Sequence, residues 1–358
     1  MDTIKTKNKP KPFKLLLVVI FLIFAEFLIL FTLNYPQIIK LINDKKERKY
    51  LESKEFKIGL VTDLHAKRSK KNNYALKPDL NNYISHFVNK MNNQFMPDIV
   101  VENGDFIEGT GRKGEKSEFD WLELQSKFLN LKMPFLHVIG NHETRGMTRD
   151  RWKELTGNNN TYYTFDVDRM RVIVLDGNQK GRESENKDAY YEEEENEDED
   201  ENEEEEEDDK NKEEESIYKM RSEQLIWLEK ILRNTKNYKI VVFIHYPLSS
   251  YAYPSDSKRL SPIQSETLKK LFSKYNVAAV FSGHVEKLYY EKIDGVNYFV
   301  LPGIRKSKNK NVLWLDCYYE IVIKNNNVKT KMYYKKNEND TEYKELLIPS
   351  EEYEFIEK

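Results

Sequence analysis

The sequence predicts an α/β protein in which helices flank β-sheet and the functional residues gather where strands end. Five apolar, β-branched runs have the length of buried strands, at residues 57–61, 98–101, 135–139, 240–244 and 277–281. Helix-like sequence lies between most of these runs, and a short polar cluster follows each of them. Because ligands in α/β folds bind outside the carboxyl ends of the strands, clusters far apart in the sequence are expected to converge on one site.

Two amphipathic helices are predicted between the first runs, at residues 77–93 and 119–131. In the second helix, four apolar residues are expected on or beside one face: Phe119, Leu122, Phe128 and Leu131. A proline stands shortly before each strand that follows, where it ends the preceding helical pattern. The repeated order of helix, proline, strand and polar turn is typical of crossover connections.

The polar clusters carry the residue types of a metal site. Cys317 is the only cysteine, so a thiolate site is excluded, whereas carboxylate, amide and imidazole ligands suit Mn, Fe or Zn. Two ions about 3.5–4 Å apart need a bridging carboxylate, for which Asp105 is the candidate. Such a pair polarises a phosphoryl group and activates a bound water, which predicts hydrolysis of a phosphate ester. In chain order the clusters are Asp63-Leu64-His65, Gly104-Asp105, Gly140-Asn141-His142-Glu143, His245-Tyr246-Pro247 and Gly283-His284-Val285-Glu286.

The order of these clusters resembles that of the calcineurin-like metallophosphoesterases, over residues 56–305. The resemblance implies a two-sheet sandwich flanked by helices. It implies that His142 is a catalytic residue beside the metals, which stabilises the transition state or protonates the leaving oxygen. It also implies the metal ligands: Asp63 and His65 for the first ion, Asp105 as the catalytic bridge, and Asn141, His245 and His284 for the second ion.

One position departs from the family pattern. The family's last cluster reads G-H-x-H, and this chain has Glu286 in place of the second histidine. A carboxylate there is expected to replace the imidazole as a ligand of the first ion, which would favour Mn, Mg or Fe over Zn and lower the Lewis acidity of that ion. The alternative is a weakened or single-metal site. The predicted cofactors are two divalent metal ions, Mn²⁺ or Fe²⁺/Zn²⁺.

Each cluster taken singly occurs by chance in many proteins, and a lone histidine after a strand is more often structural than a ligand. The prediction depends on the conjunction of five clusters, which use four of the six histidines. The other two are interpreted as structural, His86 on the surface of a helix and His137 in a buried run. Arg145, directly after the third cluster, is the candidate substrate-binding residue, and Arg112, Tyr246 and Arg305 are weaker candidates.

Residues 15–33 are almost wholly apolar, about the length that crosses a membrane as a helix. Glu26 interrupts this stretch at a depth where a carboxylate is costly. A cleaved signal peptide is the alternative, but the stretch is longer than a usual signal core and no small-x-small site follows it. Lysines stand closer to the apolar stretch on its amino side. The sequence therefore predicts a single-pass membrane anchor with the catalytic domain on the outer face.

Residues 192–215 hold 19 acidic and two basic side chains, a composition expected to stay disordered. Without this run, 56 basic and 42 acidic residues remain, a formal charge of +14 that suits phosphate-bearing substrates or an anionic membrane. The run is interpreted as a solubilising insertion, or alternatively as a segment that folds back over the basic surface.

The sequence as a whole predicts a membrane-anchored, metal-dependent phosphoesterase whose partner is a phosphomonoester or phosphodiester substrate. A catalytically weak or inactive scaffold of the same fold is the alternative. No P-loop and no zinc-finger spacing occur, which argues against a P-loop nucleoside triphosphatase and against sequence-specific nucleic-acid binding.

Strands near residues 312–315 and 329–334 are expected to complete a second sheet. The predicted parts are a basic segment at 1–14, the anchor at 15–34, a linker at 35–54, the metallophosphoesterase domain at 55–340 with its insertion at about 183–215, and a tail at 341–358.

Overall fold

The computed structural model describes part of the chain, in two compact units, Met1–Ser53 and Lys54–Lys358. In the first unit the described residues are short helical stretches from Ile39 onward. The predicted anchor and the acidic run at 192–215 lie outside the described residues. Within the part that is described, no helix is both long and apolar enough to span a membrane. The described residues are 39–40, 43–47, 49–50, 53–69, 75–76, 78–178, 220–235, 238–248, 260, 262–304, 314–325, 327–337 and 339–349.

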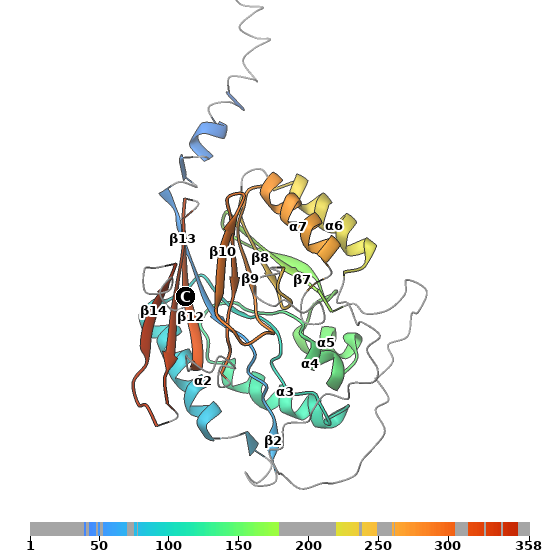
Figure 1. The fold of residues 1–358 in the computed structure, drawn as a ribbon, viewed down its shortest axis with the longest axis vertical. Coiled ribbons are helices and arrows are strands. Elements are labelled where there is room, and N and C mark those ends of the chain that lie inside the picture. The colour runs from blue at the N-terminus through green and yellow to red at the C-terminus, as the bar shows by residue number, and fades with distance from the viewer. Residues whose placement is uncertain are drawn as a thin grey trace, which may run out of the picture. The chain divides into compact units, whose positions relative to one another are not determined.

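Two six-stranded sheets form the centre of the second unit (Figure 1). The first contains β1 (Glu55–Val61), β4 (Ile99–Glu102), β5 (Phe135–His137), β12 (Leu315–Lys324), β13 (Asn327–Lys335) and β14 (Lys344–Ile348). The second contains β6 (Tyr163–Val167), β7 (Met170–Leu175), β8 (Lys239–Ile244), β9 (Val277–Ser282), β10 (Tyr289–Ile293) and β11 (Val296–Val300). Their strand orders are β14-β13-β12-β1-β4-β5 and β10-β11-β9-β8-β7-β6, and β2 (Arg68–Ser69) pairs with β3 (Ala75–Leu76) separately.

All five apolar runs form strands as predicted, but they divide between the two sheets. The strands β1, β4 and β5 are parallel neighbours in the first sheet. In the second sheet β8 and β9 are parallel neighbours, with β7 and β11 parallel beside them. Because parallel strands end at the same edge of a sheet, each sheet delivers its polar clusters to one edge.

The strands near the carboxyl end extend the first sheet, so the prediction that they complete a second sheet is wrong. β12 pairs antiparallel with β1, from Glu55 opposite Lys324 to Leu60 opposite Tyr319, and β13 and β14 follow in order. This pairing satisfies the backbone groups on the side of β1 that β4 does not cover. The sheet also continues past the predicted domain boundary at residue 340, because β14 lies at Lys344–Ile348 and pairs with β13.

Helices cover the outer faces of the two sheets (Figure 1). On the first sheet lie α2 (Pro78–Lys90), continued by a π-helix at Met91–Phe95, and α3 (Glu115–Phe128), close to the two predicted helices. The second sheet is covered by α6 (Ser222–Arg233) and α7 (Pro262–Lys274). Two short helices, α4 (Asn141–Gly146) and α5 (Arg149–Thr156), follow β5.

The buried face of α3 agrees with the prediction at Phe128 but differs from it at Phe119 and Leu122. Phe119 and Leu122 are 52% and 48% exposed, whereas Trp121, Leu124 and Phe128 are buried. These three side chains lie at positions i, i+3 and i+7 of one helical face, and the large indole of Trp121 packs against Phe106 in the core beneath the helix.

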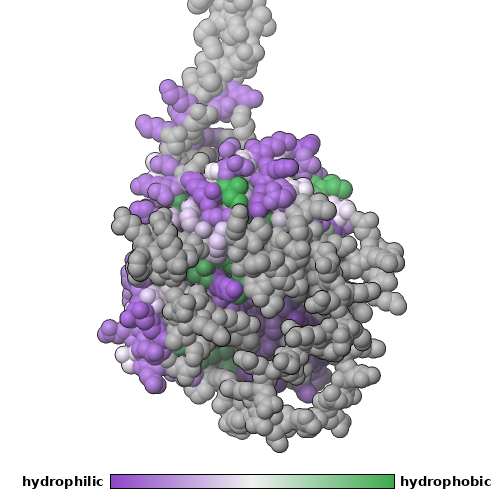
Figure 2. Space-filling view, viewed as in Figure 1, coloured by the Kyte–Doolittle hydropathy of each residue, from purple (hydrophilic) through white to green (hydrophobic). Residues whose placement is uncertain are grey.

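The main core lies between the sheets. Alternate residues of β1, Phe56, Ile58 and Leu60, point into it and meet side chains of β7 and β8 such as Val172 and Phe243. This alternation is the two-residue period of a strand that is packed on both faces. Among the described residues on the face that Figure 2 shows, hydrophobic residues form small patches between hydrophilic ones. The two sheets are thus fixed against each other, and their carboxyl edges present the polar clusters.

Candidate metal centre

Every predicted site residue of the five clusters stands just beyond the carboxyl end of a strand. Asp63 and His65 follow β1, and Asp105 follows β4; Asn141 and His142 begin α4 after β5; His245 follows β8; and His284 and Glu286 follow β9. Both sheets therefore contribute to one site, as the clusters predicted.

Direct hydrogen bonds join these loops. The Asp63 N–H donates to the Gly104 carbonyl at 2.9 Å, and the His65 N–H donates to the Asp105 carbonyl at 2.9 Å. These two bonds hold the loops after β1 and β4 side by side. The Asp63 carboxylate then accepts the backbone N–H of His284 at 3.0 Å, which ties the first sheet to the second.

The backbone is strained at five of the site residues. Asp63, His65, Asp105, His284 and Glu286 have φ angles of 51°, 44°, 56°, 68° and 48°, in the left-handed region that non-glycine residues rarely occupy. Asp63 and His65, two left-handed residues separated by one other, are matched by His284 and Glu286 with the same spacing. Residues held in such conformations cost of order 1–3 kcal/mol each and gather at functional sites, where the surrounding contacts determine them.

Glycines allow the loops to approach one another. A side chain at Gly283 would collide with the Asp63 carboxylate, and one at Gly140 would collide with the Asp105 carboxylate. At Gly303 it would meet the backbone and Cβ of Asp63. No local sequence pattern marks Gly303, because its role depends on a contact that only the fold creates.

A first group of possible ligands surrounds His65. Its Nε2 lies 4.0 Å from Asp63 Oδ1, 3.8 Å from Asp105 Oδ2 and 3.7 Å from Glu286 Oε1. Ligand atoms of one ion lie no more than about 4.4 Å apart, twice a bond of about 2.2 Å. Each of these three distances from His65 Nε2 is short enough for the carboxylate to share an ion with His65.

A second group contains Asp105, His245 and His284, whose donor atoms lie within 4.8 Å of one another. His245 Nδ1 donates to the Asn103 carbonyl at 2.9 Å, so its Nε2 is turned toward Asp105 Oδ2 at 3.1 Å. Within the described part of the chain, Asn141 Oδ1 is buried without a hydrogen-bond partner. A cation would satisfy such a buried oxygen, and the spacing of Asp105, His245 and His284 fits a metal ion.

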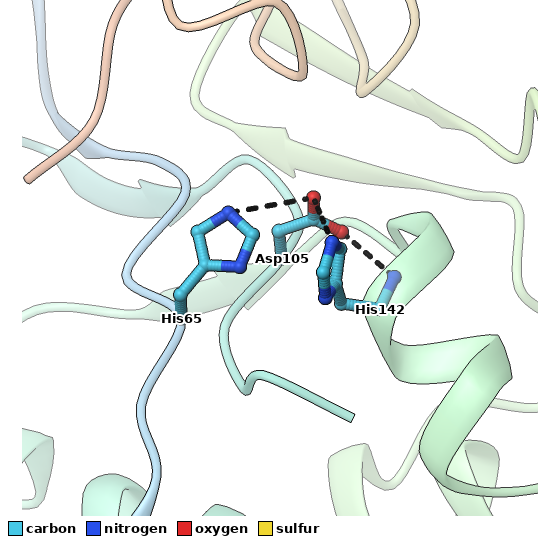
Figure 3. A group of neighbouring side chains, drawn as sticks. All are labelled: His65, Asp105 and His142. Atoms are coloured by element: carbon cyan, nitrogen blue, oxygen red, sulfur yellow. Dashed lines mark hydrogen bonds and ion pairs between the residues drawn. The ribbon is translucent and has the colours of Figure 1, made fainter. Parts of the chain in front are cut away.

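Asp105 also contacts His142. Figure 3 shows the Asp105 carboxylate between the imidazoles of His65 and His142. The carboxylate accepts the backbone N–H of His142 at 2.9 Å, and its other oxygen lies 3.9 Å from His142 Nε2. The three residues together also satisfy metal-site spacing, so the geometry alone admits His142 as a ligand. Its Nδ1 is engaged by the carbonyl of Glu108, which leaves Nε2 facing the site.

The charges of the site shift several pKa values. Burial by itself raises the pKa of Asp105, but the neighbouring charges of His245, His142 and His65 outweigh it and hold that pKa well below its usual value. Burial lowers the pKa of His245, but the Asp105 carboxylate raises it to about 10. The two groups thus form a buried ion pair when no cation is present. His245 must lose its proton before Nε2 can bind a metal ion.

Asp63 and His142 are shifted for different reasons. Burial raises the pKa of Asp63 to about 7, against the opposing charge of His245. Burial lowers the pKa of His142, but Asp105 and the contacts with Glu108 raise it above its usual value. The positive charge of Arg145 lowers the pKa of His142.

Three buried or nearly buried glutamates support these side chains, and none of them was among the predicted site residues. Glu143 is fully buried and accepts N–H groups of the loop that carries Asp105. Glu102 accepts the Gly104 N–H at 2.7 Å. The carboxylate oxygens of Glu108 lie 3.7 Å from His65 Nδ1 and 3.5 Å from His142 Nδ1. Only Glu143 had a visible signal, its place within the third cluster.

The arginine candidates for substrate binding differ in their position and in their partners. Arg145 is exposed beside the site, and its Nη1 lies 3.1 Å from His142 Nε2 and 3.3 Å from Thr110 Oγ1. Arg112 instead forms a fork with the buried Asp120, so its guanidinium has a structural partner. Tyr246, the tyrosine candidate, is buried, and its hydroxyl donates to Asn178 Oδ1 at 2.9 Å. Arg305 lies outside the described residues.

The two remaining histidines lie apart from the two ligand groups, as predicted. His137 is 4% exposed and packs among aromatic rings, with Nδ1 3.2 Å from Glu102 Oε2. His86 lies on α2, where it stacks on Tyr343 and its Nε2 contacts the Tyr318 hydroxyl at 3.0 Å.

Two helix-flanked sheets with carboxylate, amide and imidazole side chains at their carboxyl edges define a metal-dependent phosphoric ester hydrolase. The family model described as calcineurin-like phosphoesterase matches residues 56–287, and the chain belongs to this family. The resemblance seen in the sequence is confirmed, as is the mixed α/β two-sheet fold that it implied.

Curated relatives and solved structures agree with this assignment. The chain is 24% identical over 233 residues to the probable glycerophosphodiester phosphodiesterase of Arcobacter nitrofigilis, covering 64% of this chain and 71% of that protein. It is 26% identical over 237 residues to the manganese-dependent ADP-ribose/CDP-alcohol diphosphatase of Mus musculus, covering 58% and 69%. A dimetal phosphatase structure from Danio rerio shares the fold at a TM-score of 0.55 and 15% identity, covering 82% of this chain and 98% of that one. The structure of GAP50, described as the anchor in the inner membrane complex of Plasmodium, gives a TM-score of 0.50 at 15% identity, covering 84% and 90%.

Proposed function

We propose that this protein hydrolyses a phosphodiester, or a phosphomonoester, at a centre of two divalent metal ions. The observation that carries the proposal is the position of the Asp105 carboxylate. Its Oδ2 lies 3.8 Å from His65 Nε2 in one group of donors and 3.1 Å from His245 Nε2 in the other. A carboxylate shared by two groups of ligands is the requirement for a bridged pair of ions.

The proposed ligands are Asp63, His65, Asp105 and Glu286 for the first ion, and Asp105, Asn141, His245 and His284 for the second. When bound, the ions would polarise the phosphoryl group and supply the water nucleophile. The backbone bonds between the loops, and the carboxylates of Glu143 and Glu102, hold the ligands in place beforehand. Their contribution is preorganisation of the donor atoms.

His142 is the proposed general acid for the leaving oxygen. Glu108 engages Nδ1 and so turns Nε2 toward the site. The raised pKa of His142 favours the protonated form that this role requires. Arg145 lies beside the same nitrogen and is exposed, so its guanidinium can leave His142 and bind a phosphate oxygen of the substrate.

Glu286 is proposed to act as a metal ligand rather than as a sign of decay. Its Oε1 lies 3.7 Å from His65 Nε2, and its backbone repeats the strained conformation of His284. With three carboxylates and one imidazole, the first site is harder than a histidine-rich one, which favours Mn²⁺ or Fe²⁺ over Zn²⁺. The mouse relative is named as a manganese-dependent diphosphatase, which supports the same choice of metal.

The substrate is proposed to carry a diester or phosphoanhydride linkage. The two curated relatives are named as a phosphodiesterase and a diphosphatase, which supports this class over simple monoesters. Attachment to a membrane through residues 15–33, with the catalytic unit on the outer face, remains a proposal. It is supported by the apolar length and the flanking lysines alone.

A non-catalytic scaffold is the second candidate, and Glu286 is the observation that favours it, because this position departs from the family pattern. GAP50, described as an anchor, has a similar fold, which supports this candidate at the level of fold alone. Assays of bis-p-nitrophenyl phosphate and p-nitrophenyl phosphate hydrolysis separate the two. The full chain in detergent is stripped of metal and then supplied with Mn²⁺, Fe²⁺ or Zn²⁺.

Turnover that returns with Mn²⁺ and disappears in Asp105→Asn and His142→Ala is the expected result. Arg145→Gln is expected to raise KM about tenfold with a smaller effect on kcat, since it removes a charge-assisted bond to substrate. Metal binding without turnover of either substrate under any of the three ions would favour the scaffold.

A further inference from the structure

A groove of about 420 Å³ opens on the outer face of the first sheet, away from the metal centre. It lies where β1 begins, beside the turn between β12 and β13, because Glu55 pairs with Lys324 in the sheet and both residues line the groove. The metal centre follows the opposite end of β1. The helix α2 covers a neighbouring part of this face, where Phe87 packs on Tyr318.

The groove combines an apolar floor with a basic rim. Val322 and Leu347 contribute apolar surface, and Leu347 is 42% exposed. Lys324, Lys329 and Lys331 line the same groove together with Glu55 and Glu320, so lysines outnumber glutamates on the rim, and Glu320 is paired with Lys90 at 3.7 Å. Lys331 forms an ion pair with Glu345 at 3.0 Å, whereas no ion pair among the described residues engages the other two lysines. Acidic side chains with apolar neighbours would complement such a surface.

We propose that the carboxyl-terminal segment of this chain, residues 350–358, docks in this groove. The segment reads Ser-Glu-Glu-Tyr-Glu-Phe-Ile-Glu-Lys, so four glutamates alternate with or flank three large apolar side chains. It complements both the basic rim and the apolar floor of the groove.

Chain connectivity favours this occupant over a separate partner. The segment starts two residues after β14 ends at Ile348, and Leu347 of β14 already lines the groove. Nine extended residues reach about 30 Å, which is more than the groove requires. Because the segment is tethered beside its site, its effective concentration is in the millimolar range. Docking would also cover β14, the edge strand of the first sheet, whose unpaired backbone groups would otherwise invite another chain.

Disulfide trapping in the full chain tests this placement. The only native cysteine, Cys317, is buried. Asn327→Cys, in the groove, is combined with Phe355→Cys, and the matched control combines Phe355→Cys with Lys336→Cys at the other end of β13. After mild oxidation, mass spectrometry measures the cross-linked fraction. We expect it to be about fivefold higher for the groove pair than for the control, given the local concentration that docking creates.

A charge swap supplies the second arm. Lys329→Glu should lower the cross-linked fraction about threefold, the effect of one exposed ion pair. Adding Glu354→Lys to the same chain should restore it. Unchanged phosphoesterase activity shows that these variants are folded, since the metal centre lies beyond the far end of β1. Equal cross-linking in both cysteine pairs, or no response to Lys329→Glu, overturns the proposal. Binding of phosphatidylserine vesicles to the groove also overturns it, if that binding weakens as the groove lysines are replaced and is the same with and without residues 350–358.

Discussion

The carboxylate of Glu143 accepts the backbone N–H of Asp105 at 3.0 Å. The same carboxylate accepts the N–H groups of Gly140 at 2.8 Å and Ile107 at 3.1 Å. Glu143 lies on α4, so one buried side chain fixes the loop after β4 against the loop after β5. The position of the proposed bridging ligand therefore depends on a residue that is outside the proposed ligand set.

Glu143→Gln is expected to weaken metal binding roughly 10-fold to 100-fold, as loss of a supporting hydrogen-bond partner does at other metal sites. The glutamine must turn an NH₂ group toward backbone N–H donors, which leaves at least one of them unsatisfied. Calorimetric titration of metal-free protein with Mn²⁺ measures the effect. Glu154→Gln, on the exposed face of α5, is the matched control. Equal affinities in both variants would show that Glu143 does not position Asp105.

Glu286→His is expected to change metal preference rather than abolish binding. An imidazole in place of the carboxylate makes the first site softer, so the ratio of Zn²⁺ to Mn²⁺ affinity should rise by about tenfold or more. Competition between the two ions, followed by elemental analysis of the protein, measures this ratio. An unchanged ratio would place Glu286 outside the ligand set and favour the scaffold interpretation.

Gly283→Ala is expected to destroy activity through a steric effect. A methyl group there meets the Thr62 hydroxyl and the Asp63 carboxylate, and relieving the overlap should cost about 1–3 kcal/mol of stability. The displaced Asp63 would no longer align with His65. Gly295→Ala, far from the site, is the comparison variant: a methyl group there meets no other atom within 4 Å, so its cost comes from the positive φ of 86° alone, and it should lower stability while keeping activity. Urea unfolding and phosphoesterase assays on both variants give the comparison, and an active Gly283→Ala enzyme would argue against the close approach of these loops.

His137 predicts a pH dependence of stability. Burial lowers its pKa from 6.5 to about 3. The unfolded chain therefore binds a proton between these values that the folded protein does not bind, so this residue makes the free energy of unfolding fall as the pH decreases from 6.5 toward 3. His137→Gln keeps an N–H donor for Glu102 and removes the titration. Urea unfolding across this range should give a flatter pH dependence for the variant, and parallel curves would contradict the buried, neutral imidazole.

Much of the site was predictable because several of its functional residues are close to one another in the sequence. Asp63 with His65, and Asn141 with His142, are close in sequence and each pair follows a strand that its apolar residues reveal. The rule that ligands gather at the carboxyl ends of strands then brought distant clusters together. The structure does bring these residues to one place.

Other features depend on contacts that no local pattern encodes. The assignment of β12 to the first sheet follows from its register with β1, and the exposed Phe119 shows that apolar identity alone does not decide burial. Glu108 and Glu102 act on histidines and backbone groups that meet them only in the folded protein. Arg112 was considered for substrate binding because arginines bind phosphate, and only the structure reveals its partner, Asp120.

The central claim is that Asp105 joins two groups of ligands into one centre. Calorimetric titration of the metal-free full chain with Mn²⁺, combined with elemental analysis of the saturated protein, tests it most directly. The account predicts two ions per chain in the wild type and a loss of affinity for both in Asp105→Asn. A single ion per chain, or an Asp105→Asn variant that still binds two ions as tightly as the wild type, would contradict it.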